Sequence, residues 1–351
     1  MFRSSVLWAW LVSRVIVLVA LLTALLIPAH RHASLLAWDG YWYETIAVHG
    51  YAASPAGAIR FFPVLPLLAR WSAALVLAPP GVMLVVIGNA AALLYLFLAR
   101  RVALAAGLGN PAADLSTAAV ALAPAGFVLA MGYTEALFGV LVCVVLLGAR
   151  RGRWWACAAA ALVAGALRPT GVLLCLPTAI EAARGLRAAT PGGLVARLAA
   201  TCAPAAGLVA YLGWAWHAYG DPLTPFRVQT AADLRGGVLV NPFTSLVRAV
   251  ETPWPALIRV VWILVALALL VVSARRLPVS FTVFAAATVF LAVTARNFGS
   301  FERYACSALP LLLAAAAVLA ERPRLRLVAA IAAPLILFGQ SLLSFTSSYV
   351  P

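Results

Sequence analysis

A short run of residues combines carboxylates with aromatic rings, and this combination suits carbohydrate chemistry. The run is WDGYWYETIAVHGY at residues 38–51; its acids are Asp39 and Glu44, and the rings beside them belong to Trp38, Tyr41, Trp42 and Tyr43. Aromatic rings stack on the apolar face of a pyranose, while a carboxylate accepts hydrogen bonds from sugar hydroxyls or takes a proton from one. An aromatic belt at a membrane interface would explain the rings but not the acids among them. The run therefore favours a sugar site.

Arginines that could hold a phosphate stand near the ends of apolar segments. They are Arg168, Arg296 and Arg303. A planar guanidinium can grip two phosphate oxygens at once, and its charge persists at any physiological pH. These side chains are therefore predicted to bind a phosphate group and to stabilise charge that develops on it.

Four further polar residues are assigned to sugar or acceptor binding. They are Glu135, Glu302, His49 and Arg60. Glu135 and Glu302 could instead pair with the arginines, and Glu302 is favoured for pairing because it adjoins Arg303. His49 and Arg60 are more typical of loop residues that form hydrogen bonds than of catalysts.

No metal-binding motif accompanies these residues. Asp39 and Glu44 are five positions apart and do not form the DxD motif that is typical of nucleotide-sugar enzymes. The five cysteines lie in or beside apolar runs, without the spacing of metal ligands. We therefore expect no divalent metal requirement and no other cofactor, although an aspartate and a glutamate together could coordinate a metal.

The elements that position these residues belong to a membrane. Hydrophobic residues make up 65% of the 351-residue chain, and the mean hydropathy is +1.03, far above that of soluble domains. All 25 basic residues are arginine, and with 10 acidic residues they give a formal charge of +15. Arginines between apolar runs are typical of the ends of membrane spans rather than of a nucleic-acid surface. We predict an integral membrane protein with no nucleic-acid partner.

Apolar segments that could form membrane helices recur along the chain. A span needs about 20 apolar residues, and eleven candidate segments occur: 6–28, 81–99, 115–131, 134–149, 154–167, 170–183, 194–216, 257–274, 278–294, 304–320 and 325–343. The predicted fold class is an all-α polytopic bundle, with residues 1–351 as a single transmembrane catalytic domain. Residues 61–78 contain two prolines and a central Arg70, so this segment is predicted to be interfacial or re-entrant.

The distribution of arginines predicts the orientation of the chain. Fourteen arginines against three acids lie at one set of connections, namely the N-terminus and the turns around 100–114, 150–153, 184–197, 275–276 and 321–326. Such an excess marks the cytoplasmic side. The two long connections, residues 29–60 and 217–256, then lie on the non-cytoplasmic side, and the candidate site residues share that side.

Several motifs, taken together, resemble one family. They are WDGYW followed by IAVHGY, FFPVLPLL, GYTEALF at 132–138, LRPTGVL at 167–173 and FERYACSALP at 301–310. Their order and content are similar to the PIG-V-type mannosyltransferases of the GT-C glycosyltransferase superfamily. The resemblance implies a GT-C-like bundle with a helical first outer loop. It also implies transfer of mannose from polyprenyl-phosphate mannose to a glycolipid hydroxyl, with Asp39 as the general base.

The composition modifies what the resemblance implies. A chain rich in alanine and arginine and free of lysine is typical of a bacterium with a GC-rich genome, which has no GPI anchors. We therefore expect the bacterial plasma membrane, a lipid-phosphate sugar as donor, and a lipid-linked or glycolipid acceptor, with inversion at the sugar. Two alternatives stay open: a GT-C transferase for another polyprenyl-phosphate sugar, and a transporter or flippase of lipid-linked sugars.

Overall fold

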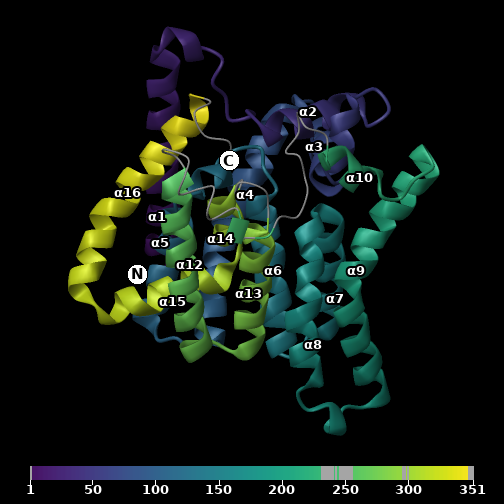
Figure 1. Ribbon diagram of the computed structural model, residues 1–351. Helices are drawn as coiled ribbons and strands as arrows, with labels where there is room; N and C mark the ends of the chain where they lie inside the picture. Colours follow the sequence, from purple (N-terminus) through teal and green to yellow (C-terminus); the bar gives the residue numbers. More distant parts are fainter. Residues whose placement is uncertain are drawn as a thin grey trace.

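The described part of the protein is built from helices. The computed structural model describes residues 2–230, 241, 243–244, 256–294, 298 and 300–346, and no strand occurs within them. The α-helices are α1 (Phe2–Leu26), α2 (Asp39–His49), α3 (Val64–Val76), α4 (Pro80–Ala105), α5 (Asn110–Ala121), α6 (Glu135–Arg150), α7 (Trp154–Leu167), α8 (Cys175–Ala183), α9 (Pro191–Tyr219), α10 (Thr224–Arg227), α12 (Ala256–Arg276), α13 (Val279–Val293), α14 (Phe301–Ser307), α15 (Leu309–Glu321) and α16 (Pro323–Phe345). The prediction of an all-α membrane bundle is confirmed (Figure 1).

Four of the described helices are long and apolar enough to cross a membrane by themselves. They are α1 over Ser5–Leu26, α4, α9 and α16. A fifth span is possible if α14 and α15, which meet at a 78° bend, cross together. The predicted spans 115–131 and 170–183 are each divided between an α-helix and a 3₁₀ turn, and α6 has 16 residues and α13 has 15, which is short for a bilayer. The number of eleven spans therefore stays a prediction.

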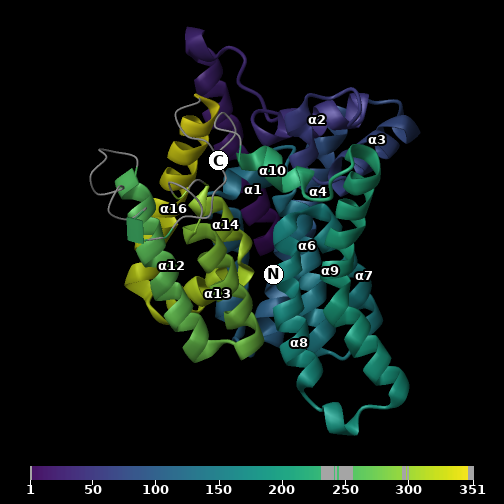
Figure 2. The same ribbon diagram turned by 45° about the vertical axis from the view of Figure 1, so that its right-hand side comes forward.

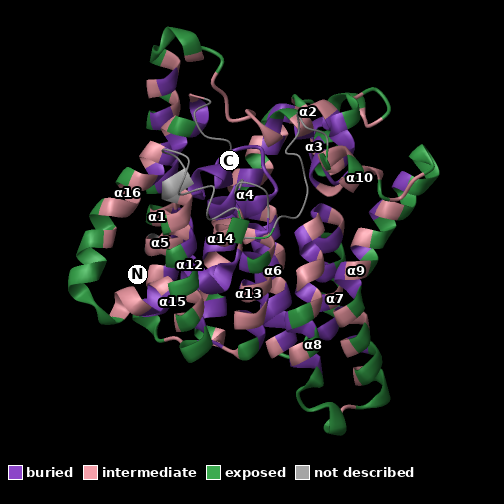
Figure 3. Ribbon diagram, in the orientation of Figure 1, coloured by how far each residue is buried: buried purple, intermediate pink, exposed green. Residues whose placement is uncertain are grey.

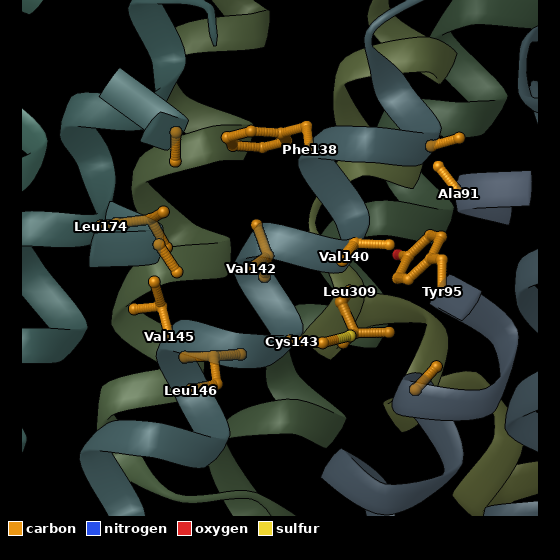
Figure 4. Packing of buried hydrophobic residues seen from close by; sticks show 14 of the residues in the cluster. Ala91, Tyr95, Phe138, Val140, Val142, Cys143, Val145, Leu146, Leu174 and Leu309 are labelled. Carbon is orange, nitrogen blue, oxygen red and sulfur yellow. The ribbon is translucent and has the colours of Figure 1, made fainter. Parts of the chain in front are cut away.

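Helix α6 lies at the centre of the bundle. Its side chains are apolar around most of its circumference, and a helix of this kind is stable only when other helices surround it. Figure 4 shows Val142 on the side that faces Leu174, and Val140 on the side that carries Tyr95 of α4. Because α6 begins at Glu135, burial of the helix brings an acid to the interior of the protein (Figure 3).

Helices α7 and α9 pack closely because each contributes a glycine. A Cβ atom added to Gly165 would collide with the backbone of Pro204, and one added to Gly207 would collide with the backbone of Leu162. Small residues let membrane helices approach until their backbones touch, and the dispersion gained replaces the hydrophobic effect that lipid does not supply. This pair holds the segment that follows α7, which carries Arg168.

The two ends of the bundle differ in their polar structure. Helices α2, α3 and α10 gather at one end, while the α8–α9 and α12–α13 turns lie at the other (Figures 1 and 2). The acids of the predicted cytoplasmic end are held in ion pairs, namely Arg100–Asp114, Arg150–Glu181 and Arg276–Glu321. The α2 end carries the aromatic run. The predicted sorting of these turns to a cytoplasmic side stays a prediction.

Helix α3 covers most of the segment 61–78. It lies beside α2 and has 13 residues. It buries Leu65 and Ala69 against the bundle and exposes Trp71 and Leu75. An exposed apolar face on a short helix suits the membrane interface. This geometry supports an interfacial segment, which stays a prediction.

Candidate functional site

Asp39 is the first residue of α2, and the local structure fixes it there. Trp38 has a positive φ of 58°, a conformation that costs a non-glycine residue about 1–3 kcal/mol and persists where the surroundings enforce it. The Trp38 indole Nε1 donates a 3.0 Å hydrogen bond to the carbonyl oxygen of Ser344 on α16. The backbone N–H of Asp39 donates to the hydroxyl of Tyr133 at 3.3 Å. The turn into α2 is therefore tied to two distant parts of the chain.

Four ionised side chains form a connected cluster around Asp39, which we call the four-charge cluster: Asp39, Glu135, Arg168 and Arg303. Arg303 Nη1 donates to Asp39 Oδ2 at 2.6 Å, and Arg303 Nε lies 3.4 Å from Glu135 Oε1. Arg168 Nη1 donates to the same Glu135 oxygen at 3.0 Å. Two carboxylates and two guanidinium groups alternate, so the formal charges cancel. This neutrality is what allows so many ionised groups to be buried together.

Exposure distinguishes Asp39 from the other members of the four-charge cluster. The side chains of Glu135, Arg168 and Arg303 are 6%, 8% and 5% exposed, whereas that of Asp39 is 22% exposed. A group that must take a proton from a substrate has to be reachable from outside the protein. Asp39 meets this requirement while it remains held by a buried arginine.

The helices are interrupted where they deliver these side chains. Arg168 precedes Pro169 and has an extended backbone, with φ −162° and ψ 151°. The proline ring would clash with the preceding residue if that residue had a helical backbone conformation. Helix α7 therefore ends there, and the chain continues as the 3₁₀ turn Pro169–Leu174. Arg303 lies on the short helix α14, before the 78° bend into α15. Both arginines thus come from breaks in helical structure, which bundles tolerate when the freed groups are satisfied inside the protein.

Aromatic rings surround the two guanidinium groups. The Arg303 guanidinium carbon lies 5.6 Å from the ring centres of both Tyr133 and Tyr304. That of Arg168 lies 5.6 Å from Tyr304 and 5.1 Å from Phe138. Cations are attracted to ring faces at such distances. Tyr304 therefore lies beside both arginines and helps to fix their spacing.

Sequence analysis did not single out Tyr133, Tyr304 or Thr134 as site residues. Burial raises the pKa of Tyr133, and the charge of Asp39 raises it further. Burial likewise raises the pKa of Tyr43, whose hydroxyl forms a hydrogen bond with Thr134. Both phenols stay protonated at neutral pH and can act as hydrogen-bonding groups beside Asp39. The available signal was their position next to Glu135 and Arg303 in the motifs.

The aromatic run of α2 forms a second feature, separate from the four-charge cluster. The Trp42 ring stacks on Phe61 with centres 5.8 Å apart and planes at 15°. The Arg60 guanidinium carbon lies 5.2 Å from the centre of Trp42 and 4.8 Å from that of Phe61. Tyr41 meets Trp42 edge-on and is exposed. Rings that already stack on one another leave only their outer surfaces for a sugar.

The remaining candidates lie in different surroundings. The Glu44 carboxylate packs against Gly81 at the start of α4. His49 is exposed at the far end of α2, about 15 Å along the helix from Asp39 at 1.5 Å per residue. Glu302 is buried, and Arg296 lies outside the described residues. The sugar- or phosphate-binding roles of these residues stay predictions.

A small cavity lies behind the four-charge cluster. It has a volume of about 20 Å³, and Tyr95, Glu135, Arg303 and Ser307 contribute to its lining. The Tyr95 hydroxyl and Glu135 Oε2 are buried and have no hydrogen-bond partner among the described residues. A cavity of this size can hold one water molecule.

The described residues contain no group of three or more histidine, cysteine, aspartate or glutamate side chains placed to share a metal ion. Asp39 and Glu135 are the acids of the four-charge cluster, and their charges are met by arginine. The four-charge cluster holds the Asp39 carboxylate near the guanidinium groups of Arg168 and Arg303. The site is largely dehydrated, and electrostatic interactions are stronger there than in water.

Comparisons with known proteins identify the fold. No protein-family model matches the chain, and no curated protein matches its sequence. The crystal structure of the Archaeoglobus fulgidus oligosaccharyltransferase in its apo form is similar, with a TM-score of 0.50, 14% identity, and coverage of 95% of this chain and 56% of that one. The complex of the same enzyme with zinc and sulfate has a TM-score of 0.50 and 14% identity, with coverage of 94% and 53%.

The chain thus spans about half the length of the solved structures it resembles. At this level of identity the likeness shows the fold alone: the described residues form an all-helical membrane bundle, arranged like that of this oligosaccharyltransferase. The finer resemblance, to the PIG-V-type mannosyltransferases, is not supported by these comparisons.

Proposed function

We propose that this protein is a glycosyltransferase that moves a sugar from a polyprenyl phosphate to an acceptor hydroxyl, with Asp39 as the general base. One observation carries the proposal: the partly exposed Asp39 carboxylate lies 2.6 Å from the buried Arg303, which connects it through Glu135 to Arg168. A base for the acceptor and cations for the donor phosphate therefore lie in one site. The GT-C-like fold supports the same class of reaction.

The proposed chemistry assigns one task to each kind of group. The acceptor oxygen bonds to the anomeric carbon, and its proton passes to Asp39. The bond between the anomeric carbon and the phosphate oxygen breaks, and its electron pair stays on the phosphate. The leaving phosphomonoester gains charge and needs cations rather than a proton. Arginine supplies such stabilisation through paired N–H donors.

Arg168 is suited to the donor phosphate because part of its guanidinium is uncommitted. Its Nη1 donates to Glu135, while Nε and Nη2 have no acceptor among the described residues. Arg303 is shared between Asp39 and Glu135. A phosphate that binds Arg303 would compete with Asp39 for the guanidinium, and a carboxylate that loses a cationic partner becomes a stronger base.

The finer features of the proposal come from the sequence. The motif resemblance supports mannose as the sugar and inversion at its anomeric carbon. The composition supports a bacterial plasma membrane. The distribution of arginines supports an N-terminus in the cytoplasm and a site on the non-cytoplasmic face, and the resemblance supports a lipid-linked or glycolipid acceptor. The pairing of both cluster acids with arginine supports metal-independent transfer. Chelation with EDTA should leave the rate unchanged if this last feature is correct.

The test is transfer by purified protein in lipid nanodiscs, with polyprenyl-phosphate [³H]mannose and a lipid extract as acceptor source. Asp39→Asn should lower transfer by on the order of a hundredfold or more. Asp114→Asn is the matched control, because it makes the same change in an arginine-paired aspartate at the other end of the bundle. An Asp39→Asn variant with the activity and pH profile of the wild type would refute the assignment. Competition with other polyprenyl-phosphate sugars tests the choice of sugar, and donor crossing without turnover would indicate a transporter.

A further inference from the structure

Arg14 is a buried cation within the first membrane span, and the proposed reaction does not use it. Its Nε donates to Asn89 Oδ1 at 2.8 Å, its Nη2 to the carbonyl oxygen of Leu129 at 2.8 Å, and its Nη1 to Ser13 Oγ at 2.9 Å. The Trp10 ring centre lies 5.3 Å from its guanidinium carbon. All these partners are neutral. A charged residue inside a span is costly and persists where it has a role.

Asn89 on α4 extends the same set of hydrogen bonds. Its Nδ2 donates to the carbonyl oxygen of Ala130 at 3.0 Å, while its Oδ1 accepts from Arg14. Two side chains from two helices therefore hold consecutive carbonyl oxygens, those of Leu129 and Ala130. The neighbouring Gly88 allows this approach, since a Cβ there would lie 2.8 Å from the oxygen of Met131. We call Arg14 and Asn89 the carbonyl clamp.

The segment held by the carbonyl clamp leads directly into the four-charge cluster. The N–H of Gly132 donates to the carbonyl oxygen of Leu35 at 3.0 Å. Tyr133 accepts a hydrogen bond from the backbone N–H of Asp39, and Glu135 pairs with both arginines of the cluster. Only a few residues separate the clamped carbonyls from these contacts, so a shift at Leu129 would move Tyr133 and Glu135.

Leu129 and the residues just before it also line the small cavity beside the four-charge cluster. Ala125, Gly126, Val128 and Leu129 line the cavity on one side, and Cys306 lines it with Arg303. A tight wall keeps the cavity near the size of one water molecule. If the wall loosened, more water would reach the ion pairs and weaken them, because their strength depends on a low local dielectric constant.

We infer that Arg14 and Asn89 are positioning residues of the proposed reaction. The carbonyl clamp fixes the segment 129–135, and Tyr133 and Glu135 on this segment then keep Asp39 and Arg303 in their relative positions. The kinetic part of this inference rests on the proposed function, and the structural part does not. A neutral hydrogen-bonding side chain at position 14 would leave the carbonyls less firmly held, because it cannot reach Asn89, Ser13 and Leu129 together with a rigid fork of donors.

Cys306 provides a reporter that does not depend on activity. N-ethylmaleimide is added to the protein in nanodiscs, and labelling of each cysteine is followed by peptide mass spectrometry. Arg14→Gln and Asn89→Ala should label Cys306 roughly tenfold faster than the wild type if the cavity wall opens locally. The exposed Cys202 should label at its usual rate, and the buried Cys143 and Cys157 should stay protected. Unchanged labelling of Cys306, or equal labelling of Cys143 and Cys157, would overturn the inference.

The kinetic arm uses polyprenyl-phosphate mannose as the probe. Arg14→Gln and Asn89→Ala should lower kcat by roughly tenfold to a hundredfold with little change in the donor KM, since misplacement of catalytic groups acts mainly on the chemical step. Arg14→Lys should recover part of kcat. Arg150→Gln is the control, because Arg150 also donates to a backbone carbonyl oxygen but lies at the other end of the bundle, where it pairs with Glu181. A variant with faster Cys306 labelling and wild-type kcat would overturn the positioning role. If the wild-type protein transferred no sugar, the proposed function would be refuted. The labelling of Cys306 would still test whether the carbonyl clamp holds the segment 129–135.

Discussion

Removal of Arg303 should destabilise the protein, and a second substitution should restore part of the loss. Arg303 lies 2.6 Å from Asp39 and 3.4 Å from Glu135. Arg303→Gln leaves two carboxylates with Arg168 as the one cation of the four-charge cluster. The cluster then carries a net negative charge in a site where its side chains are largely dehydrated. The double variant Arg303→Gln/Asp39→Asn keeps the Arg168–Glu135 pair and is neutral again.

The magnitude follows from burial. Breaking a buried ion pair by removing one partner costs about 3–5 kcal/mol, because the remaining charge is uncompensated. Asp39→Asn should cost less, about 1–2 kcal/mol, because Arg303 keeps Glu135 as a partner and the Asp39 side chain is 22% exposed. Independent effects would sum to about 4–7 kcal/mol. We expect the double variant to recover roughly 2 kcal/mol of that sum, a coupling typical of residues in one network.

The assay is a double-mutant cycle on the free energy of unfolding, measured for all four proteins in the same bicelles by reversible denaturation in sodium dodecyl sulfate. Sugar transfer should remain lost in the double variant, since both the base and a phosphate-binding cation are missing. This result separates stability from catalysis. If the destabilisation of the double variant equalled the sum of the single ones, the cluster would not be electrostatically coupled and the reasoning would be refuted.

Two further predictions concern packing and pH. Gly207→Ala should destabilise the protein by about 1–3 kcal/mol, because the added Cβ would collide with the α7 backbone. Gly213→Ala is the control on the same helix; its Cβ would meet nothing within 4 Å, so this variant should be neutral or slightly stabilising. Equal effects of the two substitutions on the free energy of unfolding would contradict the close α7–α9 contact. The raised pKa of Tyr133 means that the folded protein keeps a phenolic proton that the unfolded chain loses above pH 10. Stability should therefore be unaffected below that pH and fall above it, by up to about 1.4 kcal/mol per pH unit for this group. Tyr133→Phe should decline less steeply between pH 10 and 11, and an identical slope would argue against a buried, protonated Tyr133.

The sequence by itself determined that the protein lies in a membrane and that it is built from helices. Apolar runs bounded by arginine predict membrane helices because lipid admits only backbone that satisfies its own hydrogen bonds. The same patterning predicted opposite ends of the bundle for the aromatic run and for the arginine-rich turns. Asp39 was selected because its carboxylate stands among aromatic rings in a motif of the family resemblance, Arg168 and Arg303 because arginines near the ends of apolar segments could hold a phosphate, and Glu135 because it could bind a sugar or pair with an arginine. These are local properties of the chain, and local properties can be read from residue order.

The tertiary structure decided which of these groups meet. Among the described residues, Arg303 forms ion pairs with Asp39 and Glu135, which come from two other helices, and the pairing of Glu302 with an arginine stays a prediction. Neighbours on a helix point about 100° apart, so adjacency does not imply contact.

Arg14 could be recognised from the sequence only as a charge within a span. Its acceptors on Asn89 and Leu129 lie 75 and 115 positions away along the chain. Hydrogen bonds and ion pairs act over a few ångströms, and the packing of helices decides which distant residues come that close. The sequence supplies the charges, and the bundle supplies their partners.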